Sequence, residues 1–246
     1  MNKIYTNTTP QISFNGRVVM KRASLFNPRR ICNFDVDHSK YDHLEIKSKR
    51  NTHCKSKNEM TTTVNSPAMG VLAYENYSIK PKEKEMYGSY ILTNERYRNN
   101  SLGEILRLSS IVTMLENKLK KIRIFSSCEA VIFHTKCKFE PNISEAPEAL
   151  RTLREIARSK SEEFSRQAKA LLAKVDHRQI NNEQLFKSTN KLTKGFLHDT
   201  IKRKNYTPTT FDRWYIDMVL TEENVLKHKD HFNQLFQKHG IEYTIN

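Results

Sequence analysis

The stretch RYRNNSLGEIL, residues 96–106, combines the residue types that best suit the binding of an anion. It separates a segment rich in β-branched and aromatic residues from an amphipathic helical pattern, so the backbone changes there from extended to helical. The first amides of a helix have no partner within the helix, and the helix dipole places partial positive charge at the same end. Arg98 adds a cation, and Gly103 lets the backbone come close to a ligand. Together these features are typical of a phosphate-binding turn.

The same residues also fit a purely structural role. Ser101 and Glu104 have the S-x-x-E spacing of a capping box, in which the serine hydroxyl accepts from a backbone amide of the first turn. The glutamate then reaches back to the amide of the serine, so that side chains satisfy the free backbone groups and no ligand is needed. The residues of this stretch alone leave both interpretations open.

The surrounding elements predict how the stretch is positioned. Residues 86–93, MYGSYILT, are typical of a β-strand, and residues 101–119 place apolar side chains at helical spacing. KIRIFSS, residues 121–127, is typical of a short buried strand, and EAVIFHTK, residues 129–136, of a short helix that ends before Pro141. The order strand, helix, strand, helix predicts a βαβα unit with two parallel strands.

The rest of the chain predicts an α/β (α+β) fold with a mixed central sheet, flanking helices and an added helical hairpin in the C-terminal half. Apolar patterns at residues 146–175 and 185–201 predict the two helices of that hairpin. Thr221 and Gly240 are expected to begin and end the last helix. Further strands are expected on both sides of a turn at Pro67 and Gly70, and at Ile12–Met20, His43–Lys49, Phe211–Leu220 and 241–245.

The chain of 246 residues carries a formal net charge of +15 at pH 7. Residues 1–144 hold 24 Lys and Arg against 13 Asp and Glu, so most of the excess lies in the N-terminal part. A positive field of this strength concentrates anions, which predicts nucleic acid, a polyphosphorylated cofactor or both as partners. The alternative is a charged surface that only keeps the protein in solution. Phe26, Phe34 and Tyr41 lie among pairs of basic residues, a pattern typical of nucleic-acid binding. A basic nucleic-acid-binding protein is therefore one hypothesis for the function.

Membrane, secreted and metal-dependent classes fit the sequence less well. No stretch reaches the roughly 18–20 consecutive apolar residues of a membrane span, and the first residues, MNKIYTNTTPQ, lack the apolar run of a secretory signal. We therefore expect a cytoplasmic protein without a membrane partner. The 4 Cys form no C-x-x-C pair, and the spacing of Cys128, His134 and Cys137 does not suit a metal site, so we expect neither a metal nor a disulfide framework.

An ordered set of segments resembles the GNAT (Gcn5-related N-acetyltransferase) superfamily. It consists of the strand at residues 86–93, an R-x-x-(G)-x-G pattern from Arg98 to Gly103, the amphipathic helix, KIRIFSS, and the segment EAVIFHTKCKFEP. The resemblance covers roughly residues 86–141. With the composition and patterns of the rest of the chain, we expect four parts: a basic N-terminal extension (1–60), an acyl-CoA-binding core (61–144), a helical insertion (145–205) and a strand–helix–strand unit that completes the sheet (206–246).

The resemblance implies an acyl-CoA-dependent N-acyltransferase, with acetyl-CoA as the expected donor and an unidentified amine as the acceptor. The acceptor class stays open between a protein, a small molecule and an aminoacyl-tRNA, and the oligomeric state between a monomer and a homodimer. The strand edge at Ile91, Leu92 and Thr93 would bind the pantetheine. The following turn would bind the pyrophosphate through Arg98, Asn99, Asn100, Ser101, Leu102, Gly103 and Glu104.

Three departures from the family pattern bear on activity. Ser101 and Lys138 occupy positions where the family has glycine, and His134 stands where many relatives have a tyrosine near the sulfur of CoA. The resemblance implies that His134 could take the tyrosine's role of protonating the leaving thiolate, because a histidine pKa lies close to neutral pH. The alternative is that His134 is an ordinary helix residue on a polar face. Glu83 or Glu85 is the expected base for the amine, although both lie in a charged turn where a solvated surface role is the alternative. A GNAT scaffold without turnover also stays open.

Overall fold

The structure is a computed structural model, and it describes residues 17–22, 30–38, 41–50, 59–98, 100–203 and 215–246. Within these ranges a sheet of nine strands has the order β1-β2-β3-β4-β5-β6-β7-β9-β8, and only the β6–β7 pair is parallel. The strands are β1 (Arg17–Arg22), β2 (Arg30–His38), β3 (Tyr41–Arg50), β4 (Glu59–Ser66), β5 (Gly70–Lys80), β6 (Glu85–Thr93), β7 (Lys121–Ser126), β8 (Glu140–Pro141) and β9 (Ile216–Thr221).

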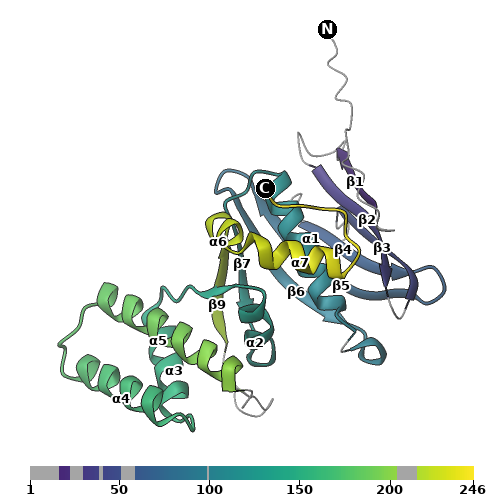
Figure 1. Cartoon of the computed structure of the whole chain (residues 1–246). Helices are drawn as coiled ribbons and strands as arrows, with labels where there is room; N and C mark the ends of the chain where they lie inside the picture. Colours follow the sequence, from purple (N-terminus) through teal and green to yellow (C-terminus); the bar gives the residue numbers. More distant parts are fainter. Residues whose placement is uncertain (1–16, 23–29, 39–40, 51–58, 99, 204–214) are drawn as a thin grey trace.

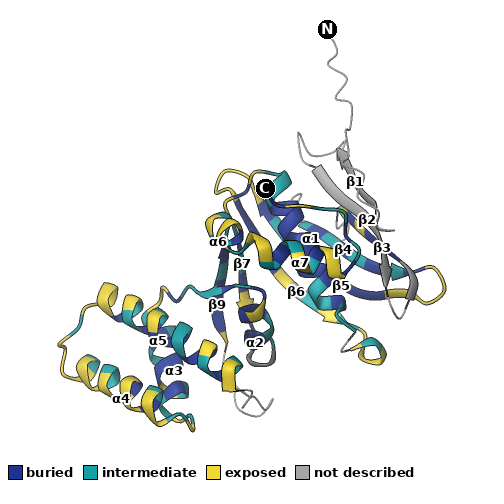
Figure 2. Cartoon of the chain, viewed as in Figure 1, coloured by how far each residue is buried: buried dark blue, intermediate teal, exposed yellow. Residues whose placement is uncertain are grey.

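Helix α1 (Leu102–Glu116) is the centre of the core. It packs on one face of the sheet, with the C-terminal helices α6 (Glu222–Lys227) and α7 (Lys229–Lys238) beside it (Figure 1). Eleven of its residues, from Leu102 to Met114, are buried. β4 alternates intermediate and buried side chains, as expected for an antiparallel strand with one face on the core (Figure 2).

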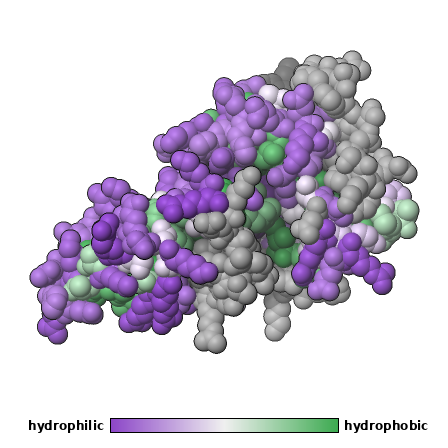
Figure 3. All heavy atoms as spheres, turned by 60° about the horizontal axis from the view of Figure 1, so that its bottom comes forward, coloured by the Kyte–Doolittle hydropathy of each residue, from purple (hydrophilic) through white to green (hydrophobic). Residues whose placement is uncertain are grey.

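The helical insertion contains three helices within the described residues, not the two that the sequence indicated. They are α3 (Ala146–Ala157), α4 (Glu162–Asp176) and α5 (Asn182–Arg203), and they extend from the end of the sheet that carries β8 and β9 (Figure 1). The expected long helix breaks after Ala157, because Arg158 ends α3 and Ser161 is extended before α4 begins. The surface on the side drawn in Figure 3 is largely hydrophilic, and no described helix is long and apolar enough to cross a bilayer.

The C-terminal end differs from its prediction in two respects. The single helix expected between Thr221 and Gly240 is divided at His228 into α6 and α7. Thr221 accepts a hydrogen bond from the amide of Asn224 at the start of α6, and Gly240 has a φ of 63° after α7, as expected. The expected last strand at residues 241–245 does not form. The segment runs back along α7 instead, where Ile245 exchanges hydrogen bonds with the side chain of Asn233.

The strand predictions before the core had a mixed outcome. The strands around Pro67 and Gly70 and the expected β6, α1, β7 and α2 (Cys128–Lys136) are confirmed. β3 contains the strand expected at His43–Lys49, which could have been an edge strand from its sequence but lies between β2 and β4. β2 was not predicted. The prediction at Ile12–Met20 falls partly outside the described residues, as does that at Phe211–Leu220; β1 and β9 cover the described parts.

Candidate active site

The two parallel strands β6 and β7 separate halfway along their length. They pair from Glu85 opposite Lys121 to Gly88 opposite Ile124, and then each follows a different neighbour. β6 continues to Thr93 along β5, whereas β7 continues along β9. The register of β6 on β5 shifts just after Gly88, as a β-bulge does, and a bulge bends the strand that carries it. The two strands therefore diverge after Gly88 and Ile124.

The divergence leaves a strand edge available for a ligand. From residue 89 to residue 93, β6 pairs with no strand on its β7 side within the described part of the chain, while its other side stays bonded to β5. This free edge is about 16 Å long, at roughly 3.3 Å per residue. It contains Ile91, Leu92 and Thr93, of which Leu92 is exposed. An extended molecule can bind such an edge through main-chain hydrogen bonds.

The turn after β6 leads into the N-terminus of α1. Asn94 caps the short 3-10 helix η1 (Glu95–Tyr97), and Arg98 follows with an exposed side chain 3.5 Å from the Glu95 carboxylate. Asn99 lies outside the described residues. The first helical hydrogen bond runs from the Ile105 amide to the Ser101 carbonyl, 3.0 Å.

The capping-box interpretation is wrong. Ser101 makes no side-chain cap bond, and Glu104 turns to the C-terminal segment, where its carboxylate lies 2.5 Å from His239 Nε2 and 2.8 Å from Lys238 Nζ. Within the described part of the chain, the backbone amides of Leu102, Gly103 and Glu104 donate no hydrogen bond. These amides, at the positive end of the helix dipole, suit an anion.

The two positions where the resemblance implies glycine have the backbone of glycine. Ser101 has a φ of 60° and Lys138 a φ of 65°, both in the left-handed region. Such a backbone costs a residue with a Cβ roughly 1–2 kcal/mol. Both positions thus have a left-handed backbone that glycine would adopt without strain, although each carries a side chain that makes this backbone unfavourable. Gly103 is not left-handed, but a Cβ there would lie 3.4 Å from Phe133 Cζ on α2.

His134 lies on α2 with its side chain inside the protein. Its ring contacts the rings of Phe133 and Phe139, and burial, followed by the charge of Arg107, holds its pKa well below the usual value. The ring is therefore neutral at pH 7, contrary to the expectation of a pKa near neutral pH. Its Nδ1 atom is buried and has no hydrogen-bond partner among the described residues. A role in protonating a thiolate stays a prediction, and it would depend on the N–H of the neutral ring.

Glu83 and Glu85 have different surroundings. Glu83 is exposed in the turn before β6, 3.5 Å from Lys80 Nζ. Glu85 is buried on β6, and its carboxylate lies 2.9 Å from Lys121 Nζ and 3.9 Å from Lys80 Nζ. The solvated surface role considered for both glutamates therefore holds for Glu83 alone. Since side chains alternate along a strand and Gly88 faces α1, Glu85 and Tyr87 are on the opposite face of the sheet.

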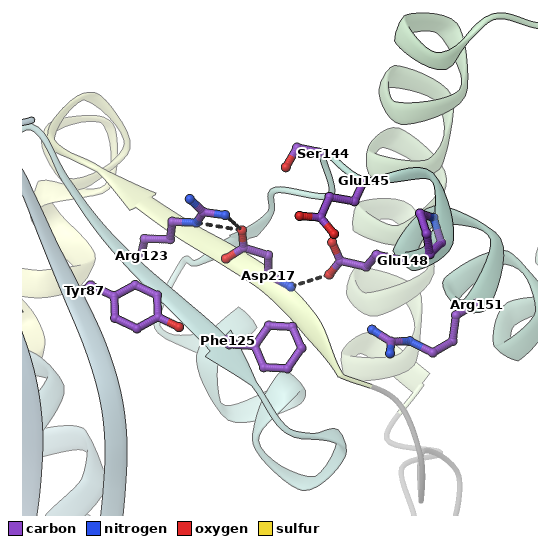
Figure 4. Close-up of a pocket in the computed structure, with 9 residues that line it drawn as sticks. Tyr87, Arg123, Phe125, Ser144, Glu145, Glu148, Arg151 and Asp217 are labelled. Carbon is purple, nitrogen blue, oxygen red and sulfur yellow. Dashed lines mark hydrogen bonds and ion pairs between the residues drawn. The ribbon is translucent and has the colours of Figure 1, made fainter.

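A hollow of about 340 Å³ opens on that opposite face (Figure 4). Its floor comes from the sheet and its wall from the segment that begins α3. The lining residues are Tyr87, Arg123, Phe125 and Asp217 from the strands, and Ser144, Glu145, Pro147, Glu148 and Arg151 from the wall. None of these residues was among the predicted site residues.

The polar groups of the hollow are connected. Arg123 Nε donates to Asp217 Oδ2 at 2.7 Å, and this carboxylate raises the pKa of Arg123. The Asp217 amide donates to Glu148 Oε1, also at 2.7 Å (Figure 4). Burial raises the pKa of Glu148, and this amide partly opposes the shift. Glu148 thus presents a half-buried carboxylate whose ionised form gains from a cation nearby.

The comparisons with known proteins found similarity at the level of structure. No family model matches the chain, and no curated protein matches it. Among solved structures, it is similar to a PaiA N-acetyltransferase from Thermoplasma acidophilum in complex with coenzyme A, at 11% identity and a TM-score of 0.32 over 36% of this chain and 56% of that one. It is also similar to Tetrahymena Gcn5, at 9% identity and a TM-score of 0.34 over 38% and 58%.

A third solved structure is a variant of the spermidine N-acetyltransferase SpeG from Vibrio cholerae, at 15% identity and a TM-score of 0.34 over 39% of this chain and 61% of that one. The chain thus spans about three fifths of the length of each of these proteins. At such identities the similarity concerns the fold alone.

Proposed function

We propose that the protein is an acyl-CoA-dependent N-acyltransferase that uses acetyl-CoA or another acyl-CoA as the donor. The observation that carries the proposal is the separation of β6 from β7 directly beside the N-terminus of α1. A ligand bound there meets a free strand edge at residues 89–93 and three free amides at Leu102–Glu104. In open sheets, ligands bind outside the carboxyl ends of parallel strands, where neighbouring connections diverge.

The residues present suit the two ends of acyl-CoA. The amides at the start of α1 and the cation of Arg98 match a pyrophosphate, which needs several donors and positive charge. The edge of β6 matches the amide groups of a pantetheine chain, because both sides offer backbone-like donors and acceptors. In this proposal Ile91 to Thr93 hold the chain, and Arg98 to Glu104 hold the diphosphate, Asn99 and Asn100 included.

The reaction would be direct. The amine nitrogen forms a bond to the thioester carbonyl carbon, the carbon–sulfur bond breaks, and the sulfur leaves as a thiolate. One proton leaves the amine nitrogen, and one reaches the thiolate. In this proposal Glu85, on the face of the sheet opposite α1, accepts the first proton through water, and the neutral His134 N–H supplies the second. Glu83 is the weaker candidate because it is exposed in the turn.

Titration calorimetry with acetyl-CoA tests the proposal. We expect saturable binding in the micromolar to millimolar range, which is usual for such a cofactor. Absence of heat at millimolar acetyl-CoA would rule the proposal out. Binding without acyl transfer to any tested amine would instead support an inactive scaffold.

Nucleic-acid binding remains the alternative function from the sequence. Phe26 lies outside the described residues, and the side chains of Phe34 and Tyr41 are not described either, so the aromatic part of that hypothesis stays a prediction. The basic excess would also suit an aminoacyl-tRNA as the acceptor. A steep loss of affinity for a short RNA with rising salt would favour this function, because phosphate contacts release counterions.

A further inference from the structure

We propose that the hollow between the sheet and α3 binds a small ammonium compound with a flat apolar group, and that this compound is the acyl acceptor. The part about the acceptor rests on the proposed function. The part about ligand binding rests on three features of the hollow: it lies where the strands separate, it contains carboxylates, and exposed aromatic rings lie at its rim.

The place of the hollow is set by Tyr87 and Phe125. Tyr87 directly precedes Gly88, the last residue of β6 that pairs with β7, and Phe125 directly follows Ile124, its partner on β7. The two side chains therefore line the hollow on both sides of the point where the strands separate (Figure 4). Helix α1 lies on the opposite face of the sheet, so a donor bound at α1 and an amine in the hollow would meet at the separation.

The charges of the hollow favour a cation. Asp217 is neutralised by Arg123, whereas Glu145 and Glu148 form no ion pair within the described residues. The remaining cation, Arg151, is exposed and donates to the Tyr215 carbonyl at 2.9 Å. The hollow thus has one carboxylate in excess, in a chain whose overall charge is +15. The local negative charge of the hollow therefore favours an ammonium group over an anion.

The rim of the hollow offers a flat apolar surface. Phe125 and Tyr215 are stacked, with ring centroids 6.0 Å apart and an angle of 11° between the planes. They are also exposed, at 51% and 42%, although large apolar side chains usually lie inside. A flat group can extend this stack at little conformational cost, since the two rings already lie nearly parallel. The volume of about 340 Å³ lies at the lower end of the range for small-molecule pockets, so it suits a small molecule as the acceptor.

Binding of 2-phenylethylamine to the full chain, without any acyl-CoA, tests the inference. We expect saturable binding by NMR or calorimetry, weakened roughly tenfold when both carboxylates are neutralised by Glu145→Gln and Glu148→Gln. A glutamine at position 148 keeps an oxygen for the Asp217 amide, so the wall should keep its shape. Glu162→Gln, which neutralises an exposed glutamate on α4 away from the hollow, is the matched control and should leave binding unchanged.

Two further comparisons separate the charge from the ring. Phe125→Ala should weaken binding several-fold, whereas Leu226→Ala, which removes another half-exposed apolar side chain, should not. 3-Phenylpropionate has the same ring with the opposite charge, and butylamine has the charge without the ring. Both should bind at least tenfold more weakly than 2-phenylethylamine.

The inference is overturned if 2-phenylethylamine shows no saturable binding up to about 10 mM, if 3-phenylpropionate binds as well, or if the double glutamine variant binds as tightly as the parent. The titration with acetyl-CoA is independent of these measurements. Binding of the amine without acetyl-CoA binding would retain the pocket and remove the proposed reaction, and the reverse result would retain the donor site and remove this acceptor.

Discussion

Arg107 Nη1 lies 2.6 Å from Glu75 Oε1, and this buried ion pair joins α1 to β5 beside the last paired residue of β6. Ser110 donates to the other oxygen of Glu75, also at 2.6 Å. A Cβ at Gly88 would lie 3.0 Å from Ile124 Cγ2 and 3.3 Å from Glu75 Oε1, so a side chain there would have to shift the ion pair or Ile124. The ion pair therefore fixes α1 against the sheet at the point where β6 and β7 separate.

Removal of one partner of this pair should be costly. Arg107→Met leaves Glu75 buried without its cation, and burial already raises the pKa of Glu75. We expect the free energy of unfolding, measured by urea denaturation, to fall by about 3–5 kcal/mol. The double variant with Glu75→Leu should recover most of that loss, because no buried charge remains. A double variant less stable than Arg107→Met would contradict this account.

The left-handed backbone at Ser101 and Lys138 predicts stabilisation by glycine. Ser101→Gly and Lys138→Gly should each raise the free energy of unfolding by roughly 1 kcal/mol, because glycine adopts a positive φ without the Cβ clash. Alanine variants at the same two positions are the controls, since they retain the Cβ and should give no gain. Equal effects of glycine and alanine in thermal or urea unfolding would show that the backbone conformation is not the cause.

The contact of Glu104 with His239 and Lys238 predicts a dependence on acid pH. The hydrogen bond from His239, the first cause, and the contact with Lys238 hold the Glu104 pKa at about 2, below its usual value near 4.5. The resulting stability is complete above about pH 4.5 and is lost as the pH falls towards 2. Glu104→Gln removes this contribution.

The test compares the two proteins over the same pH range. Urea midpoints of the parent should fall more steeply between pH 4.5 and 2 than those of Glu104→Gln. Other carboxylates titrate in both proteins, so the difference between the two curves is the quantity of interest. Parallel curves would mean that the contact adds nothing to stability.

The sequence predicted the elements whose signals are local. The strand at residues 86–93, α1 and β7 follow from the period of their apolar residues, and the parallel pairing follows from their order. The residues alone did not decide whether Ser101 caps the helix or belongs to a ligand-binding turn. Glu104 is held by His239, 135 positions away, and no local pattern reveals that contact.

The residues of the hollow were missed for the same reason. Glu148 and Asp217 are 69 positions apart and meet only because α3 begins beside β9. Each taken alone is an ordinary charged residue near the end of an element. The sequence also did not predict that Phe125 is exposed, because the pattern of KIRIFSS is typical of a strand that is buried on both faces. His134 was predicted on a helix, but its burial against Phe133 and Phe139 depends on packing that spacing does not specify.

The roles proposed for the donor site predict different effects for three variants. Arg98→Ala should weaken acetyl-CoA binding roughly tenfold, because a charge-assisted phosphate contact is lost. Gly103→Leu should weaken it at least as much, since a Cβ there already touches Phe133 at 3.4 Å and the rest of a leucine side chain would crowd the turn where the diphosphate is proposed to bind. His134→Gln should leave the affinity within about twofold, because its side chain is buried and the proposed diphosphate contacts come from Arg98 and backbone amides, but it should slow the release of free thiol in a mixture of amines.

Arg158→Ala is the matched control for Arg98→Ala. Arg158 is exposed and pairs with Glu155 three positions earlier at 3.2 Å, as Arg98 pairs with Glu95 at 3.5 Å, but it lies between α3 and α4. Its removal should change neither binding nor turnover, and since exposed pairs contribute little, it should hardly change stability. If all four variants lose affinity equally, or if the loss follows the total charge of the protein, the diphosphate is not held by the turn between β6 and α1. A loss confined to Arg98 and Gly103 places it there, because these two residues share only that turn.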